Sequence, residues 1–516
     1  MEHDVRQDET TEQRENVAED QVQLPAVSHQ ESRLLQRILL AYWAVVLACL
    51  PIWWSMTSIQ RLPLPVSRIL VQQQTISEFT ERIPVAIQDH HGQEVDASFQ
   101  RSVQHAIDEC RVASAEDWRS FEVQIVSSTS EGVVSGYSVS VRQDGQLYHV
   151  VNGRNLDFHG KSSANDAHDL GKLLCQLLNP TAGRPADNRV TQYASNIRIS
   201  LSLLNEDATQ TTKRGWGAER LIQENIHPIL EALSQVHNFT IESQVQYHAP
   251  LAFEPPRRQQ GEHDYYSLGE DELKIFINSA EWTLSSKITN DPVIHLIAFI
   301  PSMNHSPMHI YDEKNHRPLD APGFIIPQWG GVVLMNNQVL SGFHALTETQ
   351  AFSTFRTQLL TLLGVPALPS NVKFAETHSG SLSEWQVDAL LRKRTRENAE
   401  GSIQALTSIV KLVDQLENMP VGPDVRDDVL RSLEELEFIQ STNGGNASER
   451  FANSRRALEY SSRAFFNPGM VGQLYFPAEH KYAIYMLFAP ASMPLIVTGL
   501  KMAKGWFRKR REKKIE

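Results

Sequence analysis

The sequence predicts a membrane protein with two transmembrane helices, a large α/β domain with a mixed sheet between them, and a C-terminal helical subdomain. Three observations support this fold class. Two long apolar runs without charge lie near the two ends of the 516-residue chain. Strand-like and helix-like patterns interleave through most of the intervening segment. Helical patterns alone occupy the end of that segment, just before the second apolar run.

The first apolar run covers residues 38–59 and contains no charged side chain. At about 1.5 Å of rise per residue, it is long enough to cross roughly 30 Å of hydrocarbon. Trp53 and Trp54 stand near its end, where amphipathic rings favour the membrane interface. A cleaved signal peptide fits less well, because the run exceeds a usual apolar core and lies behind 37 residues. We therefore expect an uncleaved signal anchor.

The second apolar run covers residues 482–500, and eight Lys or Arg residues follow it in the tail 501–516. Because cytosolic flanks hold the positive charge, this tail should be cytosolic. Two crossings then place both termini in the cytosol and residues 60–481 in the lumen. Lys513 and Lys514 stand near the C-terminus as in dilysine retrieval signals, which predicts a resident of the endoplasmic reticulum membrane.

The acidic N-terminal segment differs from the rest of the chain. Its first 32 residues contain nine Asp or Glu and two Arg, and they cannot bury enough apolar surface to fold. Residues 1–37 are therefore expected to form a disordered cytosolic tail. The net charge of −13 argues against a nucleic-acid partner, whereas the basic tail 501–516 can contact anionic lipid headgroups.

The α/β pattern extends over residues 60–366. A hairpin is expected at residues 137–151, with Asp144 and Gly145 in its turn. Residues 323–335 form an apolar strand that Pro327 and two following glycines interrupt. The other expected strands are 84–88, 121–127, 197–204, 239–247 and 293–300, and the expected helices are 97–112, 165–178 and 218–236.

The helical subdomain is expected at residues 381–466, after a linker at 367–380. Ser381 and Glu384 have the spacing of a capping box, and a long helical pattern runs from there to Met419. Asp424 can cap a second helix that ends near Phe438. A third helix is expected at 448–465.

Three glycosylation sequons lie in the segment that the topology places in the lumen, at Asn238, Asn304 and Asn446. Asn446 lies in a glycine-rich loop and Asn238 at a helix-to-strand turn, so both should be better acceptors than Asn304. Cys49 lies within the first apolar run, which leaves Cys110 and Cys175 in the lumen. These two are either small buried side chains or a disulfide, and the sequence does not decide between the alternatives.

A search for chemical motifs finds no nucleophile elbow, zinc-binding helix or pair of cysteines two residues apart. His295, His305 and His309 are close in sequence, but a strand and a Pro-containing loop separate them and no carboxylate is in ligand register. We therefore assign no catalytic residue, no cofactor and no metal ligand. The sequence thus argues against a familiar hydrolase or dehydrogenase.

Three segments resemble the PIG-S family. The most specific is residues 465–485, which begin Phe465-Phe-Asn-Pro-Gly-Met and continue into the second apolar run; Trp54 to Pro65 and Pro327 to Gly331 match less specifically. The resemblance implies a subunit of the GPI transamidase of the endoplasmic reticulum. That complex cleaves a C-terminal signal from a precursor and attaches a glycolipid anchor, and a separate caspase-like subunit is expected to perform the catalysis.

The resemblance favours a non-catalytic scaffold whose partners are the caspase-like subunit, further membrane subunits and membrane lipid. Two spans that bracket a luminal domain would raise its effective concentration near those partners. Two other functions stay open. One is a luminal membrane-bound enzyme that acts on a glycan or lipid substrate. The other is a module of the same complex that recognises its substrate.

Overall fold

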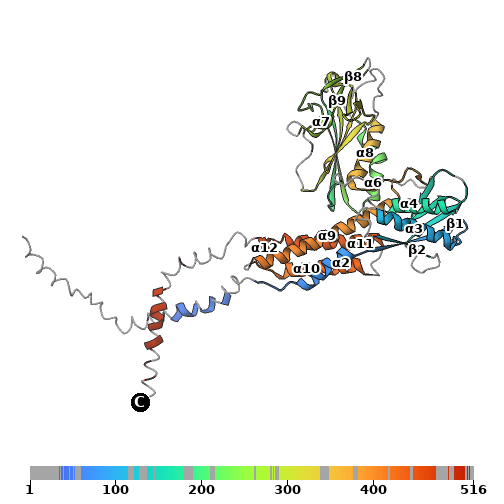
Figure 1. Cartoon of the computed structure of the whole chain (residues 1–516). Coiled ribbons are helices and arrows are strands. Elements are labelled where there is room, and N and C mark those ends of the chain that lie inside the picture. The colour runs from blue at the N-terminus through green and yellow to red at the C-terminus, as the bar shows by residue number, and fades with distance from the viewer. Residues whose placement is uncertain are drawn as a thin grey trace, which may run out of the picture. The chain divides into compact units, whose positions relative to one another are not determined.

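The computed structural model of the 516-residue chain divides into two compact units (Figure 1). The larger unit comprises residues 64–411 and 424–466, and the smaller unit comprises 1–63, 412–423 and 467–516. The structure describes residues 60–113, 121–126, 136–144, 146–161, 163–178, 190–207, 209, 216–260, 263–278, 282, 284, 290–336, 348–375, 382–416, 419–441 and 446–471, with scattered residues at 34–52 and 486–511.

The larger unit contains three sheets instead of the single mixed sheet expected. The first sheet has six strands in the order β15-β4-β5-β3-β1-β2, and among its neighbouring pairs only β4 and β5 run antiparallel. Helices α3 (Ala97–Ala113) and α4 (Ala164–Leu178) bury their apolar residues in its core. The strands are β1 (Glu81–Asp89), β2 (Phe121–Val126), β3 (Tyr137–Arg142), β4 (His149–Asn152), β5 (Asn155–His159) and β15 (Val372–Phe374).

The hairpin expected at residues 137–151 is wrong. Strand β3 pairs with β5 in parallel, and β4 and β5 form the hairpin instead. Gly153 lies in their turn with a φ of 59°, a left-handed conformation that glycine adopts without steric cost. Asn152 pairs with Asn155, so the two-residue loop of this hairpin is Gly153 and Arg154. The expected linker 367–380 is also corrected, since it contains the edge strand β15.

The second sheet has five strands in the order β13-β14-β10-β6-β7. Only the β13–β14 pair is antiparallel, so the apolar segment 323–335 is a hairpin and not one interrupted strand. Its strands are β6 (Asn196–Asn205), β7 (Asn238–Gln246), β10 (Val293–Ile300), β13 (Gly323–Ile326) and β14 (Gly330–Leu334), and its helices are α5 (Ala218–Asn225), α6 (His227–Ala232) and α8 (Glu348–Leu363).

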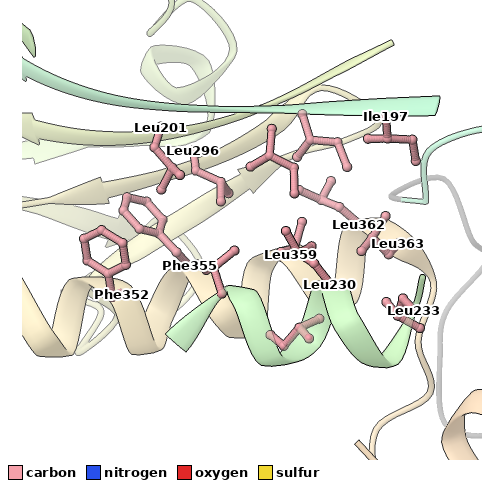
Figure 2. Close-up of a cluster of buried hydrophobic side chains, with 14 of the residues drawn as sticks. Ile197, Leu201, Leu230, Leu233, Leu296, Phe352, Phe355, Leu359, Leu362 and Leu363 are labelled. Atoms are coloured by element: carbon pink, nitrogen blue, oxygen red, sulfur yellow. The ribbon is translucent and has the colours of Figure 1, made fainter. Parts of the chain in front are cut away.

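The core of the second sheet forms against α6 and α8. Figure 2 shows Phe352, Phe355 and Leu359 of α8 directed at the strands that carry Leu201 and Leu296. All five side chains are fully buried. The helix expected at 218–236 divides into α5 and α6, and Pro228 stands at the start of α6, where a residue without an N–H is tolerated.

A third, smaller sheet lies among residues for which the sequence predicted no strands. Its order is β12-β11-β9-β8. Its core includes Phe276, Trp282 and Phe299, the last contributed by β10 of the second sheet. The elements here are β8 (Arg257–Gln260), β9 (His263–Leu268), α7 (Glu270–Lys274), the 3-10 turn η3 (Met303–His305), β11 (Met308–Asp312) and β12 (Arg317–Pro318).

The expected helical region is present and contains α9 (Glu384–Gln415), α10 (Pro423–Gln440) and α11 (Ala447–Phe465), whereas the short α12 (Pro468–Val471) belongs to the smaller unit. A helix that was not predicted, α2 (Val66–Glu78), joins the helical region through an ion pair of 2.8 Å between Arg68 and Glu437 of α10. The capping box of α9 uses Ser383 and Gln386, two residues after the expected pair. Helix α9 also ends at Gln415, before the expected Met419.

The smaller unit includes the described parts of both apolar runs. Within the described residues, none of the helices combines the length and the apolar character that a bilayer crossing requires. Parts of 38–59 and 482–500, most of the tail 1–37, and Lys513 and Lys514 lie outside the described residues. The two transmembrane helices therefore stay a prediction.

Candidate functional site: the α9 junction and the Pro327–Gly331 turn

Helix α9 contributes apolar side chains to the cores of two sheets. Trp385 is buried in the core of the first sheet, where its ring centroid lies 4.2 Å from that of Tyr137. Leu390 and Leu391 are buried in the core of the second sheet. At about 100° per residue, Trp385 lies on the side of the helix opposite to Leu390 and Leu391, so opposite sides of α9 pack on the two α/β layers.

A buried polar network ties α9 to the first sheet. Asp388 is 4% exposed, and it accepts hydrogen bonds of 2.8 Å from the Tyr137 hydroxyl and from Nε of Arg154. Nη2 of Arg392 in turn donates to the Tyr137 oxygen at 2.6 Å. Burial raises the pKa of Tyr137, so its hydroxyl stays protonated and can donate to Asp388. Such a network favours one arrangement of α9 on the first sheet, because the loss of any of its hydrogen bonds would leave a buried charge without its partner.

A second set of hydrogen bonds ties α9 to the second sheet. Nη2 of Arg394 donates to the carbonyl oxygens of Thr191 and Leu363 at 3.3 and 3.2 Å. Leu363 is the last residue of α8, where terminal carbonyls need external donors. Gln386 adds a bond of 2.7 Å from its Nε2 to the carbonyl of Pro366. The helix end and the segment after it are therefore fixed to α9.

The Pro327–Gly331 turn connects β13 and β14 and is held tightly against β10. The Trp329 ring stacks on His295 of β10 with centroids 4.5 Å apart, and the His295 N–H donates to the Trp329 carbonyl at 3.1 Å. A Cβ on Gly330 would lie 2.0 Å from the His295 carbonyl oxygen, so only glycine fits there. Gln358 of α8 donates from Nε2 to the carbonyls of Phe324 and Val332, both at 3.0 Å. Burial lowers the pKa of His295 to about 4, which keeps the stacked ring neutral near pH 7.

The three histidines of the sequence analysis do not converge. His295 lies on β10 beside Trp329, whereas His305 lies in η3 between two carboxylates. Its Nδ1 is 2.6 Å from Glu206 and its Nε2 is 3.1 Å from Glu254. His309 lies on β11 and packs edge-on to Tyr265. Among the described residues, no group of three or more His, Cys, Asp or Glu side chains is arranged so that it could hold a metal ion.

The three sequon asparagines are exposed. Asn238 opens β7 and donates from Nδ2 to Asn196 at 3.2 Å. Asn446 caps α11, where its side chain accepts from the Glu449 N–H at 3.0 Å and leaves Nδ2, the atom that a glycan takes, unused by that bond. Asn304 lies in η3. Exposure therefore does not separate the three, and the ranking stays a prediction.

Cys110 of α3 and Cys175 of α4 form a disulfide, with Cα atoms 6.6 Å apart. This resolves the alternatives left open by the sequence in favour of the bond. Part of the family-like segment 54–65 is also described: Arg61 donates from Nη2 to the Val413 carbonyl at 2.5 Å, and Leu62 donates to the Val421 carbonyl at 3.0 Å. Most of the family-like segment 465–485 lies outside the described residues.

Sequence reasoning missed the residues that organise the junction. Asp388, Arg392 and Arg394 stand in a helical pattern rich in charge, where solvated faces are the usual interpretation. One signal was available: a charged helix that also carries Trp385, Leu390 and Leu391 must bury at least one face. Which charged residues share that face depends on the neighbouring sheets, and no local pattern encodes it.

The fold and the junction define a multi-sheet α/β protein organised around one long helix. A model of the family described as "Phosphatidylinositol-glycan biosynthesis class S protein" (PIG-S) matches residues 40–509. The chain therefore belongs to the PIG-S family.

Curated relatives from distant organisms are similar over almost their whole length. The "GPI-anchor transamidase component PIGS" of Bos taurus is 27% identical over 89% of this chain and 93% of its own. The "GPI transamidase component PIG-S homolog" of Schizosaccharomyces pombe is 25% identical, over 93% of this chain and 86% of its own. The "GPI transamidase component GPI17" of Saccharomyces cerevisiae is 26% identical, over 86% of each chain.

Proposed function

We propose that this chain is a non-catalytic scaffold subunit of a GPI transamidase, which supports the attachment of GPI anchors to precursor proteins. Family membership and the names of the relatives support a role in that complex. Catalysis is assigned to a separate, caspase-like subunit. The partners of this chain are that subunit, other membrane subunits and membrane lipid.

The observation that carries the scaffold function is the double attachment of α9. Asp388 and Arg394 lie on one helix, and they hold the first and the second sheet through buried hydrogen bonds. A scaffold must present several surfaces in a fixed arrangement, and buried bonds of this kind cost free energy to break. The two alternatives, an enzyme and a substrate-recognition module, lack an equally specific observation among the described residues.

We also propose that the protein resides in the endoplasmic reticulum membrane, with residues 38–59 and 482–500 as spans and both termini cytosolic. The charge-free runs and the basic tail support this topology. A contact within the smaller unit agrees with paired spans: a Cβ on Gly499 would lie 2.8 Å from Nε1 of Trp43. Small residues permit such close approach between membrane helices.

Protease protection in sealed microsomes tests the topology. Protease added from outside should trim only the two ends and leave the large middle segment intact. Digestion of the middle segment would exclude this arrangement. Replacing Lys513 and Lys514 with Ser should separately release part of the protein to later compartments, and an unchanged location would remove the dilysine as the cause of retention.

Complementation of cells that lack the chain tests the scaffold function. Such cells should lose surface GPI-anchored proteins and accumulate uncleaved precursors, and the wild-type chain should restore both. Trp329→Asp places a charge beside His295 and should reduce both anchoring and the co-purification of partner subunits. Gly217→Ala is the control, because nothing lies within 4 Å of the added Cβ.

To distinguish a scaffold from a catalytic subunit, the amount of surface GPI-anchored protein is compared with the amount of partner subunit that co-purifies. Alanine substitutions at the described histidines, acids and cysteines should reduce anchoring only as far as they reduce co-purification of partners. A single substitution that abolishes anchoring while every partner still co-purifies would contradict the scaffold and favour substrate binding or catalysis.

A further inference from the structure

A cavity of about 40 Å³ lies where α2, α9 and α10 meet the edge of the first sheet. It has room for about three water molecules at 10–15 Å³ each, which is also the size of a carboxylate group with its neighbouring carbon. Most of its wall is apolar. The apolar lining residues are Ile76, Phe79, Phe121, Ala399, Leu436 and Ile439.

The polar lining of this cavity consists mainly of hydrogen-bond donors. Nε and Nη1 of Arg392, Nη1 of Arg396 and Nε2 of Gln440 are all buried, and none of them has a hydrogen-bond acceptor within the described residues. Arg392 itself is only 6% exposed. The Thr395 hydroxyl, which also lines the cavity, already donates to the Leu391 carbonyl at 2.8 Å. Four unused donors thus belong to residues that line one small space, and the described residues supply no acceptor for them.

The carboxylates near the cavity do not satisfy these donors. Nε of Arg392 and Nη1 of Arg450 lie 3.5 and 4.0 Å from the same oxygen of Glu81. These distances exceed those of hydrogen-bonded ion pairs, and Glu81 can neutralise only one of the two cations. Arg396 has its own partner in Glu400, at 2.7 Å. Asp388 supplies a second negative charge near Arg392, but its hydrogen bonds go to Tyr137 and Arg154. Nε and Nη1 of Arg392 therefore stay without an acceptor in a largely desolvated place, where an unsatisfied donor is costly.

The lining residues also indicate where the cavity opens. Phe121, Arg392, Ala399, Leu436 and Ile439 are buried. Ile76, Phe79, Glu81, Arg396 and Gln440 are half-buried, so the mouth lies between the end of α2 and the end of α10. Ile76 and Phe79 give this mouth an apolar rim. A ligand with its acceptor group inside would thus leave an apolar body against that rim.

We propose that this cavity binds a carboxylate carried on an apolar group, with the carboxylate oxygens on Arg392, Arg396 and Gln440 and the apolar body along Ile76 and Phe79. A monoanion with two acceptor oxygens fits both the unsatisfied donors and the small volume. The group can come from a fatty acid or from the C-terminal residue of an apolar peptide, because the two sources present the same chemistry. The site is independent of the scaffold function proposed above.

Calorimetric titration of the full-length chain in nanodiscs tests the site. Hexanoate, which is soluble in water, is the lipid-like probe, and N-acetyl-leucine is the peptide-like probe. At least one should bind saturably, whereas hexan-1-ol and hexylamine, which lack the negative charge, should not. Preference for hexanoate indicates a lipid source, and preference for N-acetyl-leucine indicates a peptide C-terminus. Binding of neither carboxylate, or equal binding of hexan-1-ol, overturns the proposal.

Two variants locate the binding without disturbing Arg392, whose loss could unfold the protein. Gln440→Leu removes one donor and should weaken binding about tenfold. Ala399→Met fills the cavity from α9 without changing any charge and should abolish binding. Arg456→Gln removes a surface guanidinium that pairs with Glu435 and should bind as the wild type does. Wild-type affinity in Ala399→Met, with an unchanged melting temperature, would also overturn the proposal.

Discussion

Removing the disulfide between Cys110 and Cys175 should destabilise the first sheet and its two helices more than the truncation of one small buried side chain would. The bond closes a loop with a sequence separation of 65 residues. In the chain-entropy treatment, a loop of that length stabilises the folded state by about 4 kcal/mol at 25 °C. Truncating a small buried side chain alone costs roughly 1–3 kcal/mol.

The suitable assay is amide hydrogen exchange in α3 and α4 of the Cys110→Ala/Cys175→Ala variant. A chain with several sheets does not unfold in a single two-state step, so a global melting temperature would blur the local effect. A loss of about 4 kcal/mol corresponds to exchange roughly a thousandfold faster in these helices. Either single variant should match the double variant, because each one removes the same bond.

Two controls make the result specific. Cys49→Ala alters a free cysteine and should leave exchange in α3 and α4 unchanged. A reductant should accelerate exchange in the wild type and have no further effect on the double variant. If exchange in the oxidised wild type and the double variant differs by less than about tenfold, the loop-closure argument is refuted for this protein.

Three further predictions concern the α9 junction and the turn against β10. Gly330→Ala should lower the free energy of unfolding by about 3 kcal/mol or more, because its Cβ would lie 2.0 Å from the His295 carbonyl oxygen. Gly217→Ala changes only the N-cap of α5 and meets nothing within 4 Å, so it should lower this free energy much less, and equal effects would contradict the close approach. Asp388→Ala should lower the free energy of unfolding by about 3 kcal/mol, since it leaves Arg154 without its buried partner. The α9 junction should then become susceptible to limited proteolysis, and an unchanged cleavage pattern would refute this. Burial lowers the pKa of His295 in the folded state to about 4, whereas its unfolded value is about 6.5. The contribution of the neutral ring to the free energy of unfolding should therefore be complete above pH 6.5 and decrease as the pH falls towards 4. In pH-dependent unfolding, His295→Phe should reduce this decrease, and an unchanged profile would contradict the prediction.

Local patterns were sufficient for elements whose apolar period stands out from the surrounding sequence. The strands around residues 121–126 and 293–300 and the helices α3, α4 and α11 lie where the sequence places them. Each of these elements packs against one neighbouring layer, so the spacing of its own apolar residues indicates which of them are buried. The two charge-free runs and the basic tail are equally local signals.

Strand pairing was not decided by local sequence. Asp144 and Gly145 predicted a hairpin, yet β3 pairs in parallel with β5 because the Gly153 turn closes β4 on β5 instead. The third sheet was missed because its strands are short and contain many polar residues. They are strands because they pair with one another, as β11 does with β9. Register and neighbour choice depend on contacts between distant segments.

The sequence by itself determined the family, the order of apolar run, α/β segment, helical region and apolar run, and the places of the candidate acceptor asparagines. Tertiary structure alone decided that Cys110 and Cys175 meet, that Asp388 and Arg394 hold two sheets from one helix, and that Arg392 faces a cavity with unused donors. The physical reason is that periodicity and turn chemistry are encoded over a few residues. The role of a buried charge, by contrast, depends on partners that lie hundreds of residues away in the sequence, and the charge meets them only when the chain folds.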